Sequence, residues 1–174
     1  MLIREQARRI ARHRWAERRL FEFVGAWSID ENDADAARHF AAQARHHAWR
    51  ASMWDEVLPV LHDIESTIGP PASIVEAFDA LAGSATTAER LACLSEVVMP
   101  ALVGRYEHDL ASADPVADAP MIRVLRLVVA DAKEDWQAAA LLHRSVVRTE
   151  EDVDRAAAHQ SRLELLLSSW TSED

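Results

Sequence analysis

Five polar residues interrupt the apolar faces of three predicted helices, and their types could support metal binding or proton transfer. Glu17 falls within the apolar stripe of the first helix. Gln43 and His47 are four residues apart in the second helix, and Asp131 and Asp135 have the same spacing in a later one. Residues four apart lie on one helix face. Because a buried, unpaired carboxylate is very unfavourable, we expect these acids to be ion-paired, protonated or metal-bound.

Two adjacent histidines, His46 and His47, occur in the middle of the second predicted helix. Adjacent residues diverge by about 100° on a helix, so only one of the two can face the core squarely. His47 shares a face with Phe40 and Trp54, which favours the inward position for His47 and a peripheral one for His46. Tyr106, the only tyrosine, could supply a phenol to the same cavity.

Ion pairing within a polar core is the main alternative to metal binding for these groups. A buried polar side chain normally finds a hydrogen-bond partner within the protein. The predicted partners are Arg14 and Arg18 for Glu17, and Arg123, Arg126 or first-helix arginines for Asp131 and Asp135. The sequence therefore leaves two interpretations open, a metal site and a hydrogen-bonded, ion-paired network.

Composition and charge narrow the class of protein. The chain has 174 residues, of which 49% are hydrophobic and only four are glycine, which suits a single globular domain. Its formal net charge of −10 argues against a nucleic-acid partner. No apolar run reaches the roughly 18 residues that a membrane span requires. Cys93 is the only cysteine, so no disulfide can form within the chain and we expect a cytoplasmic protein.

Apolar residues at three- and four-residue spacings predict an all-α fold with five long helices and one short one. The predicted helices span residues 3–27, 34–61, 73–83, 86–110, 121–146 and 150–170. The turn-forming stretches SIDENDAD, STIGPPAS and ASADPVADAP separate them. No alternating, β-branched run bounded by turn residues occurs, so we expect essentially no sheet.

Several residues indicate where these helices begin, end or bend. Asn32 or Asp33 should cap the second helix, and Ser73 should cap the short one. Thr86 and Glu89 have the spacing of a capping box. Proline lacks a backbone N–H, so we expect disturbed helices at two places, Pro59 and Pro100.

The order of these helices resembles that of the ferritin-like superfamily, over about residues 3–146. The resemblance implies an up-down four-helix bundle with a short crossover helix, to which this chain adds a C-terminal helix. We expect one helical domain over residues 1–174. Its parts are a first hairpin at 3–61, a crossover at 66–85, a second hairpin at 86–146 and the extra helix at 149–170.

Ferritin-like proteins of the di-iron type use a glutamate on each of two helices and a Glu-x-x-His motif on each of the other two. Glu17 matches the first-helix glutamate. Gln43-Ala-Arg-His46 takes the place of one Glu-x-x-His motif, and Asp131-Ala-Lys-Glu134 takes the place of the other without its histidine. The resemblance implies an iron or manganese site drawn from Glu17, His46, His47, Glu96, Asp131 and Glu134.

These departures from the motif favour a metal-free bundle that binds a small ligand or another protein, because two dications need more carboxylates than remain. Its predicted polar core consists of Glu17, Gln43, His47, Tyr106, Asp131 and Asp135. The alternative is a metal-dependent oxidoreductase with one or two ions at the bundle centre. Trp15, Trp49 and Trp136 suit core packing, the walls of a small apolar ligand pocket or a homodimer interface.

Overall fold

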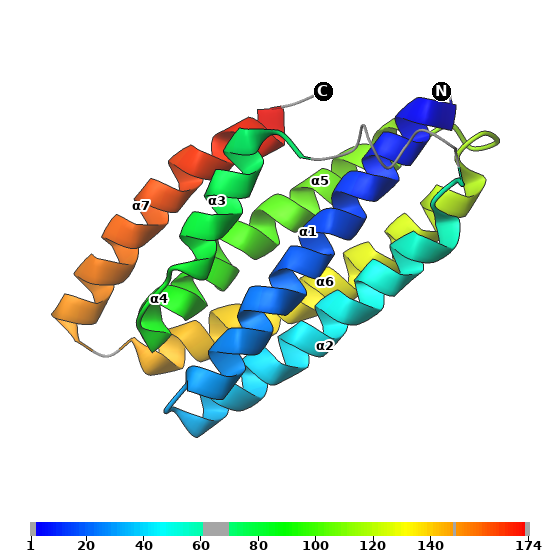
Figure 1. Ribbon diagram of the computed structural model, residues 1–174. Helices are drawn as coiled ribbons and strands as arrows, with labels where there is room; N and C mark the ends of the chain where they lie inside the picture. The colour runs from blue at the N-terminus through cyan, green and yellow to red at the C-terminus, as the bar shows by residue number, and fades with distance from the viewer. Residues whose placement is uncertain (1–2, 61–69, 148, 173–174) are drawn as a thin grey trace.

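The computed structural model describes residues 3–60, 70–147 and 149–172, and these residues form helices and connections without a strand (Figure 1). The all-α prediction is confirmed. The helices are α1 (Ile3–Asp30), α2 (Ala34–Val57), α3 (Ala72–Ala82), α4 (Thr87–Ala92), the π-helical segment η1 (Cys93–Val98), α5 (Met99–Ser112), α6 (Ala119–Val146) and α7 (Glu150–Ser172).

The long helices lie side by side. α1 packs along α2, α6 packs against both α2 and α5, and α4, η1 and α5 follow one another along the chain (Figure 1). α3 and α7 pack against each other at the edge of the molecule farthest from α2 (Figure 1). This arrangement brings the apolar faces of α1, α2, α5 and α6 towards a common interior.

The first two helices follow the predicted pattern but end at different residues. α1 continues three residues past Trp27, and the carboxylate of Asp33 caps α2 by accepting hydrogen bonds from the N–H groups of Asp35 and Ala36. α2 was expected to reach residue 61, but it ends at Val57, two residues before Pro59. Proline disfavours helical backbone at the residue before it, which accounts for the early end. Residues 58–60 are not helical, and Leu61 lies outside the described residues.

The short crossover helix starts earlier than the sequence suggests. Ser73 was expected to cap it, but the helix begins at Ala72 after Pro71, and no side chain caps it. A proline just before the first turn gives up no helical hydrogen bond, so it can begin a helix without a polar cap. The predicted capping box is confirmed, with Thr86 accepting from the Glu89 N–H and Glu89 accepting from the Thr86 N–H.

Pro100 has its structural effect one turn earlier than expected. The preceding segment, η1, is π-helical, and the N–H of Met99 donates to the carbonyl of Leu94, five residues back. Pro100 itself lies in the first turn of α5, where a missing N–H is tolerated. The predicted disturbance is therefore a change of hydrogen-bond period before the proline, the one-turn π-type insertion often found at functional sites.

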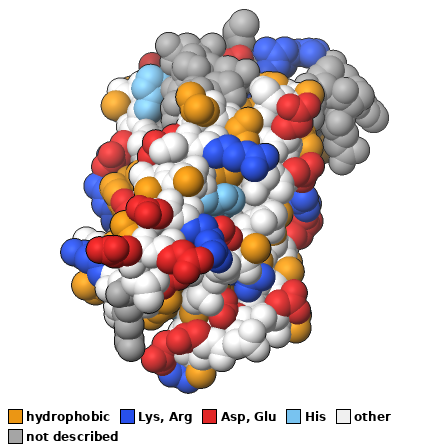
Figure 2. Space-filling model, turned by 90° about the vertical axis from the view of Figure 1, so that its left-hand side faces the viewer, with side chains coloured by type: hydrophobic (Ala, Val, Ile, Leu, Met, Phe, Trp, Pro, Cys, Tyr) orange, Lys and Arg blue, Asp and Glu red, His pale blue; other side chains and the backbone are white. Residues whose placement is uncertain are grey.

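Most of the large buried side chains form one hydrophobic cluster that includes Trp54, Tyr106, Phe40 and Phe78. α7 contributes Leu163 and Leu167 to this cluster. On the face shown in Figure 2, acidic and basic side chains are interspersed with scattered hydrophobic ones. None of the described helices is long and apolar enough to span a membrane.

The packing of α7 generates a stability prediction. Leu163 is 1% exposed and Leu165 is 78% exposed on the same helix. Leu163→Ala should lower the free energy of unfolding by about 3 kcal/mol, because it leaves a cavity in the core. Leu165→Ala should change it by less than about 0.5 kcal/mol. Urea denaturation of both variants tests this, and equal losses would show that α7 does not pack as described.

Candidate functional site

The buried side chain of Arg50 connects three helices at the centre of the bundle. From α2, its Nε donates a hydrogen bond of 2.9 Å to Glu17 Oε1 on α1. Its Nη1 donates to Asp135 Oδ2 on α6 at 2.7 Å and also to Asp131 Oδ2. Burial disfavours the charged guanidinium, but Glu17, Tyr106 and Asp135 together outweigh this and raise the pKa of Arg50 above its ordinary value. Arg50 is therefore a permanent cation among three carboxylates.

Glu17 is fully buried and is held by groups from two other helices. In addition to the hydrogen bond from Arg50, it accepts one from the Tyr106 hydroxyl on α5, and its Oε2 lies 2.6 Å from His47 Nδ1. Burial alone would raise the pKa of Glu17, but Arg50, His47 and Tyr106 together lower it below its ordinary value. Glu17 is thus ionised, and its charge is compensated where no water reaches it.

His47, rather than His46, faces the bundle interior, as its place on the apolar face predicts. Burial and the charge of Arg50 lower the pKa of His47, so the ring is neutral. Its Nδ1 lies 2.6 Å from Glu17 Oε2, which can only accept a hydrogen bond, and 2.8 Å from Arg50 Nη2, which can only donate one. The other ring nitrogen, Nε2, is buried without a hydrogen-bond partner among the described residues.

The network reaches the surface through His46. Its Nδ1 lies 2.7 Å from Asp135 Oδ1, and its side chain is 44% exposed. Gln43 is buried beside it and donates from Nε2 to the backbone carbonyl of Asp135 at 3.1 Å. His46, Asp131 and Asp135 each place one ligand-type atom within 4.8 Å of the others. These three residues form the network's open rim.

A second buried pair extends the network along α1. His13 Nε2 lies 2.7 Å from Asp109 Oδ2, and the His13 ring stacks on Trp54 at 4.7 Å between centroids. The pKa of Asp109 is lowered: burial opposes this, but His13 and the nearby arginines outweigh it. Sequence reasoning missed this pair, although His13 precedes Glu17 by four residues and Asp109 follows Tyr106 by three, which are spacings that place residues on one helix face.

The structure brings together all six residues of the predicted polar core, which are Glu17, Gln43, His47, Tyr106, Asp131 and Asp135. It does not bring together the six residues of the predicted metal set. Glu96 is exposed near Ser95 and His143, and Glu134 is exposed on α6, so neither belongs to the network. Each of these two residues falls just outside the apolar stripe of its helix.

The predicted arginine partners were wrong. Arg14 and Arg18 pair with Asp55 on the surface, and among the described residues Arg123 and Arg126 form no ion pair with Asp131 or Asp135. The actual partner is Arg50, three residues after His47 and seven after Gln43. That spacing was the available signal, because it places Arg50 on the same helix face as the other two.

Charge in the network is unbalanced. One guanidinium faces the carboxylates of Glu17, Asp131 and Asp135, so the ionised network with a neutral His47 has a net charge of −2. The set does not fit two metal ions, because Gln43 replaces a carboxylate and Arg50 already occupies oxygens of three others. The arrangement can hold protons and one guanidinium, and its rim could hold a single small cation.

No known family model, curated protein or solved structure matches this chain.

The neutral state of His47 predicts how stability depends on pH. Unfolded, this histidine gains a proton below about its ordinary pKa of 6.5, whereas the folded protein keeps it neutral. The unfolded state then binds more protons, so stability should fall by up to about 1.4 kcal/mol per pH unit as pH drops below 6.5 towards the folded-state pKa. His39, whose pKa is also lowered by burial, adds to this loss.

Urea denaturation between about pH 7.5 and 5.5 measures this slope. His47→Gln should be less stable at all these values but should show a shallower slope, because the titrating group is gone. Arg45→Gln changes an exposed arginine of the same helix, which does not titrate in this range, and should keep the wild-type slope. A slope unaffected by His47→Gln would contradict the assignment of a neutral His47. Glu17 should add a further loss of stability at lower pH, because its contribution disappears as pH falls through its lowered pKa.

Proposed function

We propose that this chain is a metal-free helical bundle of ferritin-like topology that serves as a protein-interaction module. The observation that carries the proposal is the position of Arg50, whose guanidinium lies where the carboxylates of α1 and α6 converge. A di-metal protein of the same architecture would place its cations among these carboxylates. Here a side chain of the protein supplies the positive charge.

The order of the helices supports the ferritin-like part of the proposal. α1 and α2 form one hairpin, a long connection containing α3 follows, and α4 to α6 form a second hairpin packed on the first (Figure 1). α6 contacts both α2 and α5, as a bundle requires. α7 is an addition to this plan, packed on α3 and α4.

The surface supports interaction with a protein over capture of a small ligand. Small-ligand sites enclose most of their ligand, usually in a deep apolar cavity. Three hollows lined by described residues are open, and they lie on the outer faces of α6 and of the α1–α2 hairpin. Of the three tryptophans considered as pocket walls, Trp15 packs on Phe78 in the core and Trp136 lines one of the α6 hollows. Open faces of this kind suit a partner chain.

Replacing Arg50 tests the metal-free proposal. Arg50→Met leaves three carboxylates facing one another without a cation, so it should lower the free energy of unfolding by about 3–5 kcal/mol. The variant should also acquire affinity for divalent metal, seen as a rise in melting temperature with added MnCl2 and as bound metal in elemental analysis. Wild-type protein and Arg45→Met, which changes an exposed arginine of the same helix, should show neither effect.

Near-stoichiometric iron or manganese in wild-type protein, purified after growth with both metals supplied, would overturn the proposal. An Arg50→Met variant that still binds no metal would show instead that the carboxylates cannot converge on an ion.

A second candidate function is the binding of a single divalent cation at the rim. It is favoured by the grouping of His46, Asp131 and Asp135 and by the excess negative charge of the network. Under this alternative, Mn²⁺ or Zn²⁺ should raise the melting temperature of wild-type protein, His46→Ala should abolish the rise, and His108→Ala should keep it. No metal-dependent rise in wild-type protein would remove this candidate.

A further inference from the structure

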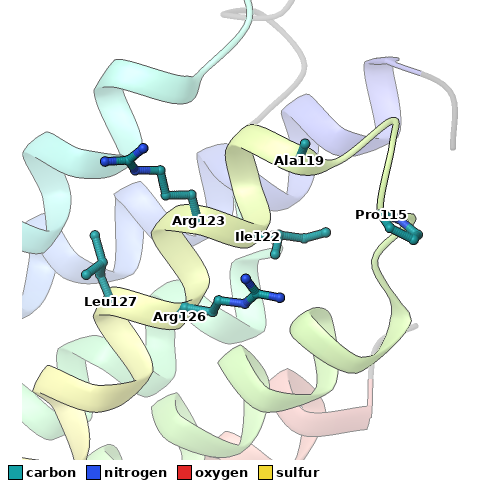
Figure 3. A pocket seen from close by; sticks show the side chains of 6 residues that line it. All are labelled: Pro115, Ala119, Ile122, Arg123, Arg126 and Leu127. Carbon is teal, nitrogen blue, oxygen red and sulfur yellow. The ribbon is translucent and has the colours of Figure 1, made fainter.

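The outer face of α6 presents two hollows in a row. The first, of about 540 Å³, is lined by Pro115, Ala119, Ile122, Arg123, Arg126 and Leu127. Figure 3 shows Ile122 and Arg126 extending to one side of the helix and Arg123 and Leu127 to the other. The second, of about 600 Å³, is lined by Lys133, Trp136, Gln137, Ala140, Leu141 and Arg144. Together these two hollows form what we call the α6 seam.

All charged side chains that line the two hollows are basic, although the chain as a whole has a net charge of −10. One exposed acid, Glu134, lies on α6 between the hollows. Arg123 and Arg126 are exposed and have no hydrogen bond or ion pair within the described part of the chain. Lys133 pairs with Glu107 on α5, and Arg144 donates to the carbonyl of Ala140. The seam therefore offers two uncompensated guanidinium groups in a predominantly acidic protein.

Exposed apolar side chains accompany these charges. Leu127 is 48% exposed and Leu141 is 65% exposed. They are 14 residues apart in sequence, which corresponds to about 21 Å along the helix. Apolar anchors spaced along one helix face, with charges beside them, are the usual elements of helix-to-helix recognition.

We propose that the α6 seam binds an acidic amphipathic helix of a partner protein. The proposal rests on the proposed function, whose partner it describes. The partner's apolar side chains would cover Leu127 and Leu141, and its carboxylates would pair with Arg123 and Arg126. An Arg–carboxylate pair can form two parallel hydrogen bonds, which fixes the register of the partner as well as attracting it.

Charge distribution favours a narrow acidic partner over a broad one. The seam contributes four positive charges to a net of −10, so the rest of the chain carries −14. An anionic membrane or a nucleic acid would face much of that negative surface and be repelled by it. A second copy of this chain also has a net charge of −10, so its negative surface would be repelled in the same way. A single helix, about 10–12 Å wide, can contact the seam alone.

Binding of model peptides to full-length protein tests the proposal. The probes are fluorescein-labelled helical peptides of about 20 residues, long enough to span 30 Å. They share the same leucine stripe and carry Glu, Gln or Lys beside it. The Glu peptide should bind with a Kd on the order of micromolar and weaken as NaCl rises, and the Lys peptide should bind at least about tenfold more weakly.

Matched variants locate the binding surface. Arg123→Glu with Arg126→Glu should weaken binding of the Glu peptide about tenfold or more. Arg45→Glu with Arg162→Glu makes the same change of net charge at exposed positions on α2 and α7 and should leave binding nearly unchanged. Leu127→Ser should also weaken binding, and circular dichroism should show that each variant stays folded.

Several results would overturn the seam proposal. They are no binding of the Glu peptide, equal binding of the Glu and Lys peptides, or equal losses in the two double variants. Binding to phosphatidylglycerol vesicles without binding to the Glu peptide would assign the seam to a membrane instead. A dimer in sedimentation that Leu127→Ser dissociates would assign it to a second copy. Metal analysis distinguishes failure of the seam proposal from failure of the proposed function. Stoichiometric metal together with intact binding of the Glu peptide would overturn the metal-free function but not the seam proposal.

Discussion

The structure depends on the burial of one guanidinium group. Arg50 has no access to water, so its charge is tolerable only while carboxylates surround it. Those carboxylates come from α1 and α6, while Arg50 comes from α2, and Tyr106 links Glu17 to α5. A shift of any one helix by a turn would separate a buried charge from its partner, which costs far more than a misplaced apolar side chain. The ion pairs thereby select one register for helices whose apolar stripes alone would permit several.

The same network determines which groups could do chemistry. Glu17 is ionised because Arg50, His47 and Tyr106 all stabilise its charge, and His47 is neutral because it is buried beside a cation. Nε2 of the His47 ring is buried without a hydrogen-bond partner among the described residues. It is enclosed, whereas the side chain of the adjacent His46 reaches solvent. The exposed end of the network, not its centre, is where an ion or proton from solution can enter.

Much of this architecture was predictable from periodicity, because helix lengths, turns and the inward positions of Glu17 and His47 follow from apolar spacing. The capping box at Thr86 was readable for the same reason, since its chemistry is local. The π-helical η1 and the early end of α2 could not be predicted from apolar spacing, because they depend on how a proline affects the backbone that precedes it. The identity of the cation was missed because arginine is expected on the surface, although the spacing of Arg50 places it on the inward face of α2.

Filling the bundle centre with a side chain has a consequence for the rest of the molecule. Arg50 occupies the centre, where its guanidinium already binds oxygens of three carboxylates. α6 carries different groups on its two faces. Its inner face supplies Asp131 and Asp135 to the network, and its outer face carries the basic and apolar side chains of the seam. Because the inner ion pairs fix the rotation of α6, they also fix the direction in which Arg123, Arg126 and Leu127 face the solvent.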